Sequence, residues 1–176
     1  MTASQTKTQR ILAWTDGSAR PTNPGYGGWA YVIDHRPSDK VYTEYAWMPH
    51  GTTNNLAELR AIRLCLLKAT ALTPSVPLIV TSDSQWAVCC INGDYKAKCH
   101  VEEIRMIQHH ITTLQDVKIQ WARGHAGQVY NELVDKMANL ATRVPNVIQA
   151  QVYERENFLE EGNEFLRKFE SFIRTA

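Results

Sequence analysis

The spacing of apolar residues changes along the chain, and each change predicts a different kind of element. Over residues 10–48, aromatic and β-branched residues form three short runs separated by breaks rich in glycine, proline and aspartate. Such runs are typical of strands joined by turns, here at residues 10–17, 27–35 and 40–48. Because the connections are short, we expect these strands to pair antiparallel.

The next region has a helical period. In residues 54–72 the apolar side chains recur at steps of three and four, which predicts an amphipathic helix with Thr53 or Asn54 as its cap. Residues 77–83, PLIVTSD, predict a fully buried strand. The following segments predict two helices, a strand and a further helix, at residues 84–91, 101–114, 117–124 and 128–142. This order implies an α/β protein with a mixed sheet covered by helices.

The character of the chain changes again from about Pro145. Apolar residues fall on one stripe of a predicted helix over residues 151–174: Phe158, Leu159, Phe165, Leu166, Phe169, Phe172 and Ile173. Charged residues occupy the rest of that helix. Such a helix either packs on its own domain or serves self-association or the docking of a protein partner.

Length and composition describe an ordinary globular protein. A chain of 176 residues suits one domain, and 44% apolar with 21% charged residues can bury a sizeable core. The net charge of +1 provides no general attraction for nucleic acid, so any such site must use local charge or bound cations. We expect no membrane span, because no apolar run is long enough, and no secretory signal in the polar start.

The cysteines add a prediction about location. Cys65, Cys89, Cys90 and Cys99 lack the spacing of zinc ligands and lie mostly among apolar residues. We therefore interpret them as buried thiols of a protein in the reducing cytoplasm.

Four carboxylates are the candidates for chemistry. Asp16 closes the first predicted strand and Asp83 the fourth, so parallel pairing of these strands would bring both acids to one edge. Glu58 lies near the start of helix 54–72, and Asp135 lies early in the last helix before Pro145. A lone aspartate at a strand end is ordinarily a turn former. Four converging carboxylates would instead repel one another, and a divalent cation such as Mg²⁺ or Mn²⁺ would relieve that repulsion.

Four motifs surround these acids. They are TDGS…NPGYGG at Asp16, TTNNLAEL at Glu58, TSDSQW at Asp83, and GHAG…NELVD at His125 and Asp135. With these motifs in this order, the chain resembles type 1 ribonuclease H. The resemblance implies a ribonuclease H-like fold of class α/β, with a five-stranded mixed sheet of order 3-2-1-4-5 flanked by helices.

The resemblance also indicates how the chain is divided. It covers residues 10–143, which we interpret as the catalytic domain. Residues 1–9 are expected to form a flexible tail, and residues 144–176 a helical extension that carries the C-terminal amphipathic helix.

The activity that the resemblance implies is hydrolysis of the RNA strand of an RNA–DNA hybrid, leaving 3′-hydroxyl and 5′-phosphate ends. Carried onto this chain, the acids that bind two Mg²⁺, or Mn²⁺ in their place, are Asp16, Glu58, Asp83 and Asp135. Asp16 would bridge the two ions. His125, in the loop RGHAG, would relay a proton or help to release product.

The same resemblance suggests how the hybrid is held. Asn23, Asn55 and Gln85 are candidates for contacts with the minor groove and the sugars. Thr53 and Asn54 are candidates for holding a phosphate of the DNA strand. Asn23 could instead serve the turn before Pro24, and Thr53 or Asn54 could cap a helix; these roles do not exclude substrate binding.

The chain departs from the family pattern in two places. The turn ARPT affects the placement of Asn23, and the stretch after Asp83 is brief. Many cellular members carry a long basic protrusion there, whereas this chain offers only Lys96, Lys98 and His100. Fewer phosphate contacts predict weaker and less salt-sensitive binding of the hybrid.

Two other classes of function compete with the enzyme. A catalytically silent hybrid-binding or scaffold module would have lost an acid, and none is missing. A DNA strand-transfer or junction-cutting enzyme could share the fold. The glycine-rich turn and the GHAG loop favour the ribonuclease over this third class.

Overall fold

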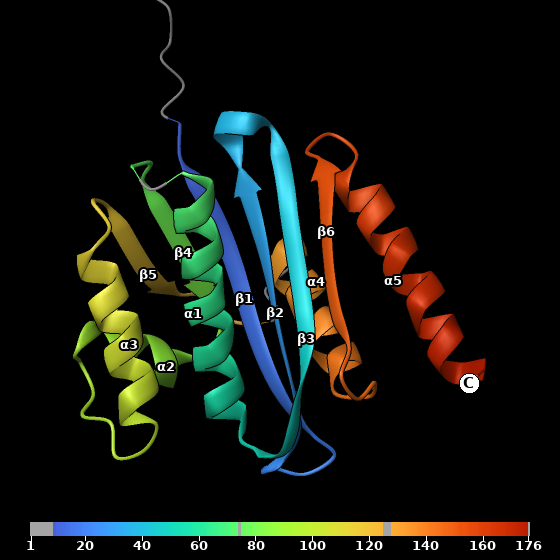
Figure 1. The fold of residues 1–176 in the computed structure, drawn as a ribbon, viewed down its shortest axis with the longest axis horizontal. Coiled ribbons are helices and arrows are strands. Elements are labelled where there is room, and N and C mark those ends of the chain that lie inside the picture. Colours follow the sequence, from blue (N-terminus) through green and yellow to red (C-terminus); the bar gives the residue numbers. More distant parts are fainter. Residues whose placement is uncertain (1–8, 74, 125–127, 176) are drawn as a thin grey trace, which may run out of the picture.

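A mixed sheet forms the middle layer of the protein (Figure 1). The computed structural model describes residues 9–73, 75–124 and 128–175. Within these residues the sheet has six strands in the order β5-β4-β1-β2-β3-β6. Their bounds are β1 Ile11–Arg20, β2 Gly25–His35, β3 Lys40–Thr52, β4 Leu78–Ser82, β5 Val117–Trp121 and β6 Ile148–Glu154. β1 pairs parallel with β4 and β4 with β5, while β1, β2, β3 and β6 pair antiparallel.

The predicted order 3-2-1-4-5 is confirmed, but the prediction of five strands is wrong. β6 adds a sixth strand beside β3, with Tyr42 opposite Val152. It occupies residues 148–154, so the predicted helix over residues 151–174 also begins too early. The segment IQAQVYE alternates only weakly between apolar and polar positions, but β3 offers it an edge with unpaired backbone groups.

The first strand also runs further than predicted. β1 continues to Arg20 because β2 keeps pairing with it, with Asp16 opposite Ala30. Asp16 therefore lies within the strand, and its placement at the strand end is wrong. The parallel ladder to β4 does end here, since its last pair joins Thr15 to Ser82. Asp16 is thus the first residue of β1 whose β4-side edge is open.

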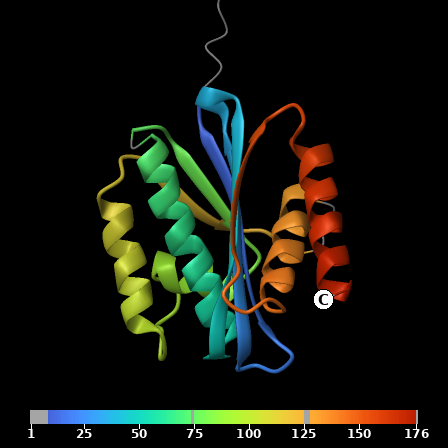
Figure 2. The ribbon, with the colours of Figure 1, turned by 45° about the vertical axis from the view of Figure 1, so that its right-hand side comes forward.

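Helices cover both faces of the sheet. α1, α2 and α3 lie on one face and α4 and α5 on the other, as the turned view shows (Figure 2). Their bounds are α1 Asn54–Leu72, α2 Gln85–Asn92, α3 Val101–Thr112, α4 Val129–Ala141 and α5 Phe158–Thr175. α1 has the predicted bounds. The prediction that Asp135 lies early in α4 is wrong. Asp135 lies in the middle of that helix. In the described part of the chain, no helix is both long and apolar enough to cross a membrane.

Each face of the sheet has its own core. Tyr31 and Ile33 of β2 belong to the cluster under α1, whereas Ala30 and Val32 belong to the cluster under α4. Strands that are buried on both faces have apolar residues at successive positions, which explains the unbroken run in β2. At Gly28 the chain requires glycine, since a Cβ there would lie 2.1 Å from the carbonyl oxygen of Ala138 in α4.

The thiols are only partly as predicted. Cys65 and Cys90 are buried and Cys89 is half-buried, and all four cysteines are free. Cys99 is exposed, so the prediction of burial is wrong for this residue. It lies in the loop between α2 and α3, where its neighbours in sequence, Lys98 and His100, are polar.

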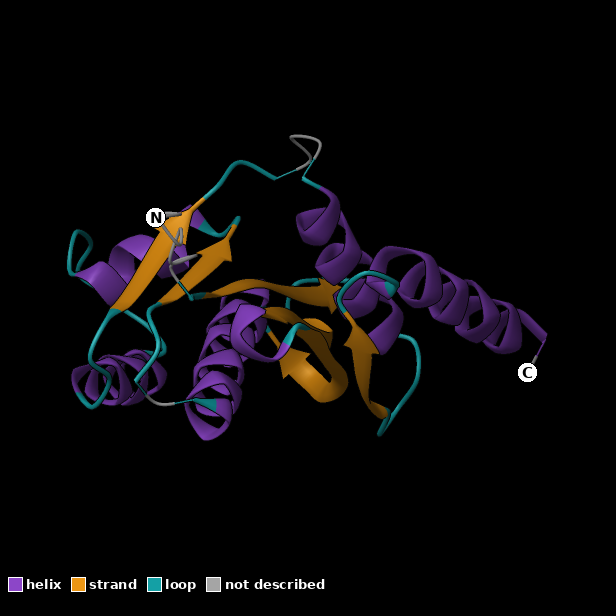
Figure 3. Cartoon of the chain, turned by 90° about the horizontal axis from the view of Figure 1, so that it is seen from above, coloured by secondary structure: helices purple, strands orange, loops and turns teal. Residues whose placement is uncertain are grey.

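The C-terminal helix α5 packs on the sheet's second face. Phe158 and Leu166 are buried in the cluster with α4, which favours packing on the same domain. The helix that carries the C-terminus lies at one end of the molecule (Figure 3). Leu159 and Phe172 remain exposed. Self-association or a protein partner at this helix stays a prediction.

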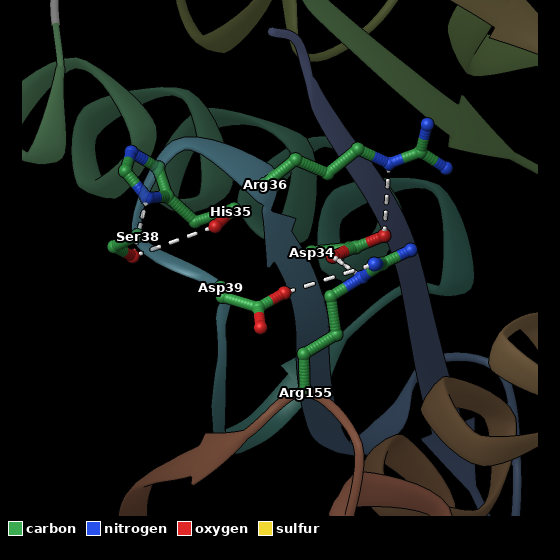
Figure 4. A network of polar contacts seen from close by, with 6 residues as sticks. All are labelled: Asp34, His35, Arg36, Ser38, Asp39 and Arg155. Carbon is green, nitrogen blue, oxygen red and sulfur yellow. Dashed lines mark hydrogen bonds and ion pairs between the residues drawn. The ribbon is translucent and has the colours of Figure 1, made fainter. Parts of the chain in front are cut away.

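A buried carboxylate ties the C-terminal segment to the sheet (Figure 4). The Asp34 side chain, at the end of β2, is 2% exposed. Its oxygens accept hydrogen bonds from Arg155 Nε at 2.8 Å and from Arg36 Nε at 3.3 Å. Arg155 directly follows β6, and its Nη1 lies 3.8 Å from Asp39 Oδ1. The two contacts of Arg155, with Asp34 and with Asp39, hold the end of β6 against the β2–β3 connection.

Replacing Arg155 therefore tests how firmly the C-terminal segment is attached. Arg155→Met leaves the buried Asp34 carboxylate with Arg36 alone and is expected to lower the free energy of unfolding by about 2 kcal/mol. Chemical denaturation monitored by circular dichroism measures the change.

The matched control is Lys40→Met. Lys40 pairs with Glu154 at 2.9 Å, but both side chains are exposed, so its loss is expected to change the free energy of unfolding much less than Arg155→Met does. Equal effects of the two substitutions would contradict the attachment through Asp34.

Candidate active site

The end of the β1–β4 ladder brings two acids together. The two strands run parallel and pair as far as Thr15 and Ser82, so the next residues along the chain, Asp16 and Asp83, lie near each other where this ladder ends. The side chains at this edge face an open cleft, which is also lined by Glu58 and Asp135. The predicted convergence of four acids at one edge of the sheet is therefore present as a shared cleft.

Glu58 reaches this edge because α1 lies directly on β1. A Cβ at Gly17 would lie 2.1 Å from the backbone nitrogen of Glu58, so only glycine allows the two backbones to approach this closely. The helix start is fixed by Thr53, whose Oγ1 accepts a hydrogen bond from the Leu56 nitrogen at 3.1 Å. Glu58, one turn further on, is buried beside Asp16.

Three of the carboxylates form a tight cluster. One oxygen from each of Asp16, Glu58 and Asp83 lies within 4.8 Å of the others. Neither Asp16 nor Glu58 has a lysine or arginine partner within 4.0 Å among the described residues. The charges of Asp16 and Glu58 therefore accumulate without a lysine or arginine among the described residues to balance them.

Burial and the accumulated negative charge both raise the pKa values of these carboxyls. Burial raises the pKa of Asp16 well above its ordinary value, and the charges of Asp83 and Asp135 raise it further. Burial likewise raises the pKa of Glu58, with added repulsion from Asp16 and Asp83. The metal-free site thus disfavours the simultaneous ionisation of its carboxyls.

The donor set fits a hard divalent cation. Glu58 Oε2 is buried and has no hydrogen-bond partner, although a buried carboxylate oxygen without a partner is costly. A cation at the cluster would satisfy this oxygen and offset the repulsion among the three acids. Mg²⁺ and Mn²⁺ prefer carboxylate oxygen ligands of this type.

Asp135 stands outside the tight cluster but is held towards the same cleft. Its Oδ1 accepts a hydrogen bond from Asn139 Nδ2 at 2.9 Å. Asn139 Oδ1 in turn accepts from Ser18 Oγ at 3.0 Å and from Arg20 Nε, both on β1. Sequence reasoning missed Asn139, although its position four residues after Asp135 places both on one face of α4.

The predicted substrate residues surround the start of α1. Asn23 Oδ1 accepts a hydrogen bond from the Asn54 nitrogen at 3.0 Å, and Asn54 Oδ1 accepts from the Ala19 nitrogen at 2.6 Å. Asn54 and Asn55 line the cleft. Of the two candidate caps, Thr53 is the cap. Its Oγ1 also lies 3.1 Å from His100 Nε2.

The remaining predicted residues flank Asp83. Gln85 is the exposed first residue of α2, two positions after Asp83. His125 lies outside the described residues. Its neighbour Gly124 lies against the cluster, since a Cβ at this position would be 2.6 Å from Asp83 Oδ2.

Comparison with known proteins shows the family of this chain. The family model for RNase H matches residues 8–143. The chain is 33% identical to a ribonuclease H of Campylobacter jejuni over 142 residues, which cover 76% of this chain and 91% of the relative. It is 31% identical to a ribonuclease H of Francisella philomiragia over 148 residues, which cover 77% of this chain and 93% of that relative. The chain therefore belongs to the RNase H family of hydrolases.

Solved structures agree with this assignment. The chain is similar to LC11-RNase H1 in complex with an RNA/DNA hybrid, with a TM-score of 0.65 and 25% identity over 76% of this chain and 96% of that one. RNase H1 of Halobacterium salinarum has the same fold, with a TM-score of 0.62 and 23% identity over 75% of this chain and 96% of that one.

Repulsion in the cluster predicts that a neutral side chain stabilises the metal-free protein. Because folding raises the pKa of Glu58, its protonated form is favoured in the native state, and stability falls as the pH rises above the ordinary value. Glu58→Gln removes this loss of stability, because the glutamine side chain does not ionise. At pH 7 without divalent metal, we expect the melting temperature to rise by about 3–6 °C, the shift that roughly 1–2 kcal/mol produces.

The sign of the effect can be checked by pH and by metal. The difference in melting temperature between wild type and Glu58→Gln should decrease as the pH falls towards 4.5, where the wild-type carboxyl is protonated. It should also decrease when Mg²⁺ is added. Glu156→Gln, at an exposed glutamate, is the control and should change little. A difference in melting temperature that does not depend on pH would contradict an electrostatic origin of the stabilisation.

Proposed function

We propose that this protein is an endoribonuclease that hydrolyses the RNA strand of RNA–DNA hybrids to 3′-hydroxyl and 5′-phosphate ends, using two Mg²⁺ ions, with Mn²⁺ as a substitute. The observation that carries the proposal is the cluster of Asp16, Glu58 and Asp83, with its unpartnered buried oxygen, in a member of the RNase H family. A similar solved structure, LC11-RNase H1, is in complex with an RNA/DNA hybrid.

The acids of the cleft have distinct tasks in this proposal. Asp16, Glu58, Asp83 and Asp135 would hold the ions, with Asp16 shared between them. When bound, such ions supply an activated water at neutral pH and stabilise the leaving 3′ oxygen. Asn139 keeps the Asp135 carboxylate directed to the cleft. His125 would relay a proton or help product to leave.

The groups around the start of α1 would recognise the hybrid. Asn23, Asn55 and Gln85 would contact the minor groove and the sugars, where the 2′-hydroxyls distinguish RNA from DNA. Thr53 and Asn54 would hold a phosphate of the DNA strand. The hydrogen bonds from Ala19 to Asn54 and from Asn54 to Asn23 support this proposal, because they connect the turn to the helix at the rim of the cleft.

The proposal extends to organisation and location. Residues 10–143 would form the catalytic domain and residues 144–176 an extension of it. We place the protein in the cytoplasm, since four free thiols suit a reducing compartment.

Cleavage assays test the function directly. With Mg²⁺, the protein is expected to cut the RNA of a labelled hybrid and to leave duplex DNA and duplex RNA intact. Asp83→Asn should lower the rate by more than about 100-fold, because even second-layer partners of metal ligands contribute 10–100-fold. Asp116→Asn is the control, since this exposed residue precedes β5 at the opposite end of the sheet from Asp83.

Denaturing gels of the products separate the alternatives. Hybrid bound but left intact by the wild type would indicate the silent binding module. Cleavage that survives removal of all divalent metal by EDTA would contradict the use of metal ions.

A further inference from the structure

A second hollow lies next to the carboxylate cleft, between α4 and α5. Arg20 and Asp135 line both the cleft and this groove, so the two adjoin. Leu140 of α4 and Leu166 of α5 are buried in its lining. The groove therefore depends on the C-terminal segment, because α5 forms one of its walls.

The groove is rich in positive charge. Four basic side chains line it, against two acidic ones: Arg20, Lys136, Arg143 and Arg167 against Asp135 and Glu170. All four basic residues are exposed. This local excess contrasts with the net charge of +1 for the whole chain. A concentration of cations beside a cleft marks a surface that attracts anions.

The cations are available to a ligand. Among the described residues, Lys136 and Arg167 form no ion pair. Arg143 lies 4.0 Å from Glu170, whose carboxylate is already engaged by Arg174 at 2.8 Å. Arg20 uses its Nε for Asn139, which leaves the outer nitrogens of its guanidinium for another acceptor.

A further hollow, which shares Arg20 and Arg143 with the groove, extends this surface. It is lined by Arg20 and Arg143 together with the aromatic ring of Tyr26, which is 43% exposed. Positive charge with an exposed aromatic ring is the combination by which proteins follow a nucleic-acid strand. The cations thus continue along the molecule from the edge of the cleft, as a chain of phosphates would require.

We propose that the groove between α4 and α5 binds the sugar–phosphate backbone of the hybrid beyond the point where it crosses the carboxylate cleft. The inference rests on the proposed function. A phosphodiester backbone approaching three clustered carboxylates is repelled, and cations at the rim offset this repulsion. Arginine and lysine are the usual partners of backbone phosphates, and such contacts position a duplex without reading its sequence.

The inference gives the C-terminal segment a task. The loop between α2 and α3 contributes only two lysines, Lys96 and Lys98, as partners for backbone phosphates. Arg167 of α5, with Lys136 of α4, would supply backbone contacts from the other side of the sheet.

The test is a pair of charge-removing substitutions with a neighbouring control. The variant K136Q/R167Q is compared with K168Q, which lies beside Arg167 in α5 but pairs with Glu164 at 2.6 Å and does not line the groove. Each is made in the wild type and in the Asp83→Asn background, where the hybrid should stay intact. Fluorescence anisotropy with a labelled hybrid gives the dissociation constant between 50 and 300 mM salt.

We expect K136Q/R167Q to raise the dissociation constant about 5–20-fold near 100 mM salt. The slope of log affinity against log salt should fall by about one to two, since each lost phosphate contact accounts for about 0.9. In the wild-type background, KM should rise while kcat stays unchanged. K168Q should match its parent within about twofold. The conservative variant K136R/R167K should restore both affinity and slope, and equal melting temperatures show that folding is intact.

Several outcomes would overturn the inference. Affinity and salt slope equal to those of the parent would do so, as would the same loss in K168Q. If inorganic phosphate binds the wild type but not K136Q/R167Q while hybrid affinity is unchanged, the groove is a site for free anions. Hybrid that is bound through the groove but never cut would refute the proposed function alone. Hybrid that is cut without dependence on the groove would refute this inference alone.

Discussion

The close approach of β1 and α1 at Gly17 is the constraint on which the site depends. With any larger residue the Cβ would lie 2.1 Å from the nitrogen of Glu58, and α1 would have to move away from the sheet. Glu58 would then leave Asp16. On the other face, Gly28 plays the same part for α4, which carries Asp135. Two glycines on neighbouring strands thus let two helices present acids to one edge of the sheet.

Packing around this edge holds together groups that repel one another. The raised pKa values of Asp16 and Glu58 record the cost of burying carboxyls beside like charges. Proteins accept such local costs at functional sites and compensate for them elsewhere. Here the compensation includes two buried clusters on opposite faces of the sheet and the Asp34–Arg155 contact that secures the C-terminal segment. That segment also completes the basic groove, so an acidic cleft and a basic groove lie next to each other.

Most of the central fold could be predicted because its signals are local. The period of three to four in α1 and the unbroken apolar run of β4 reflect burial patterns that the chain itself carries. β6 was missed because a seven-residue edge strand has weak alternation and precedes a much stronger helical stripe. The end of β1 was missed because polar residues such as Ser18 and Arg20 stay in the strand only through pairing with β2.

The sequence alone determined the resemblance to the family, because four short motifs carry it, and that resemblance implied the order of the first five strands and the four acids. Only the tertiary structure decided that three acids cluster within 4.8 Å while Asp135 is held through Asn139. It also decided that α5 faces α4 across a basic groove. Contacts between segments far apart in the chain depend on how backbones approach in space, and spacing along the sequence does not specify that approach.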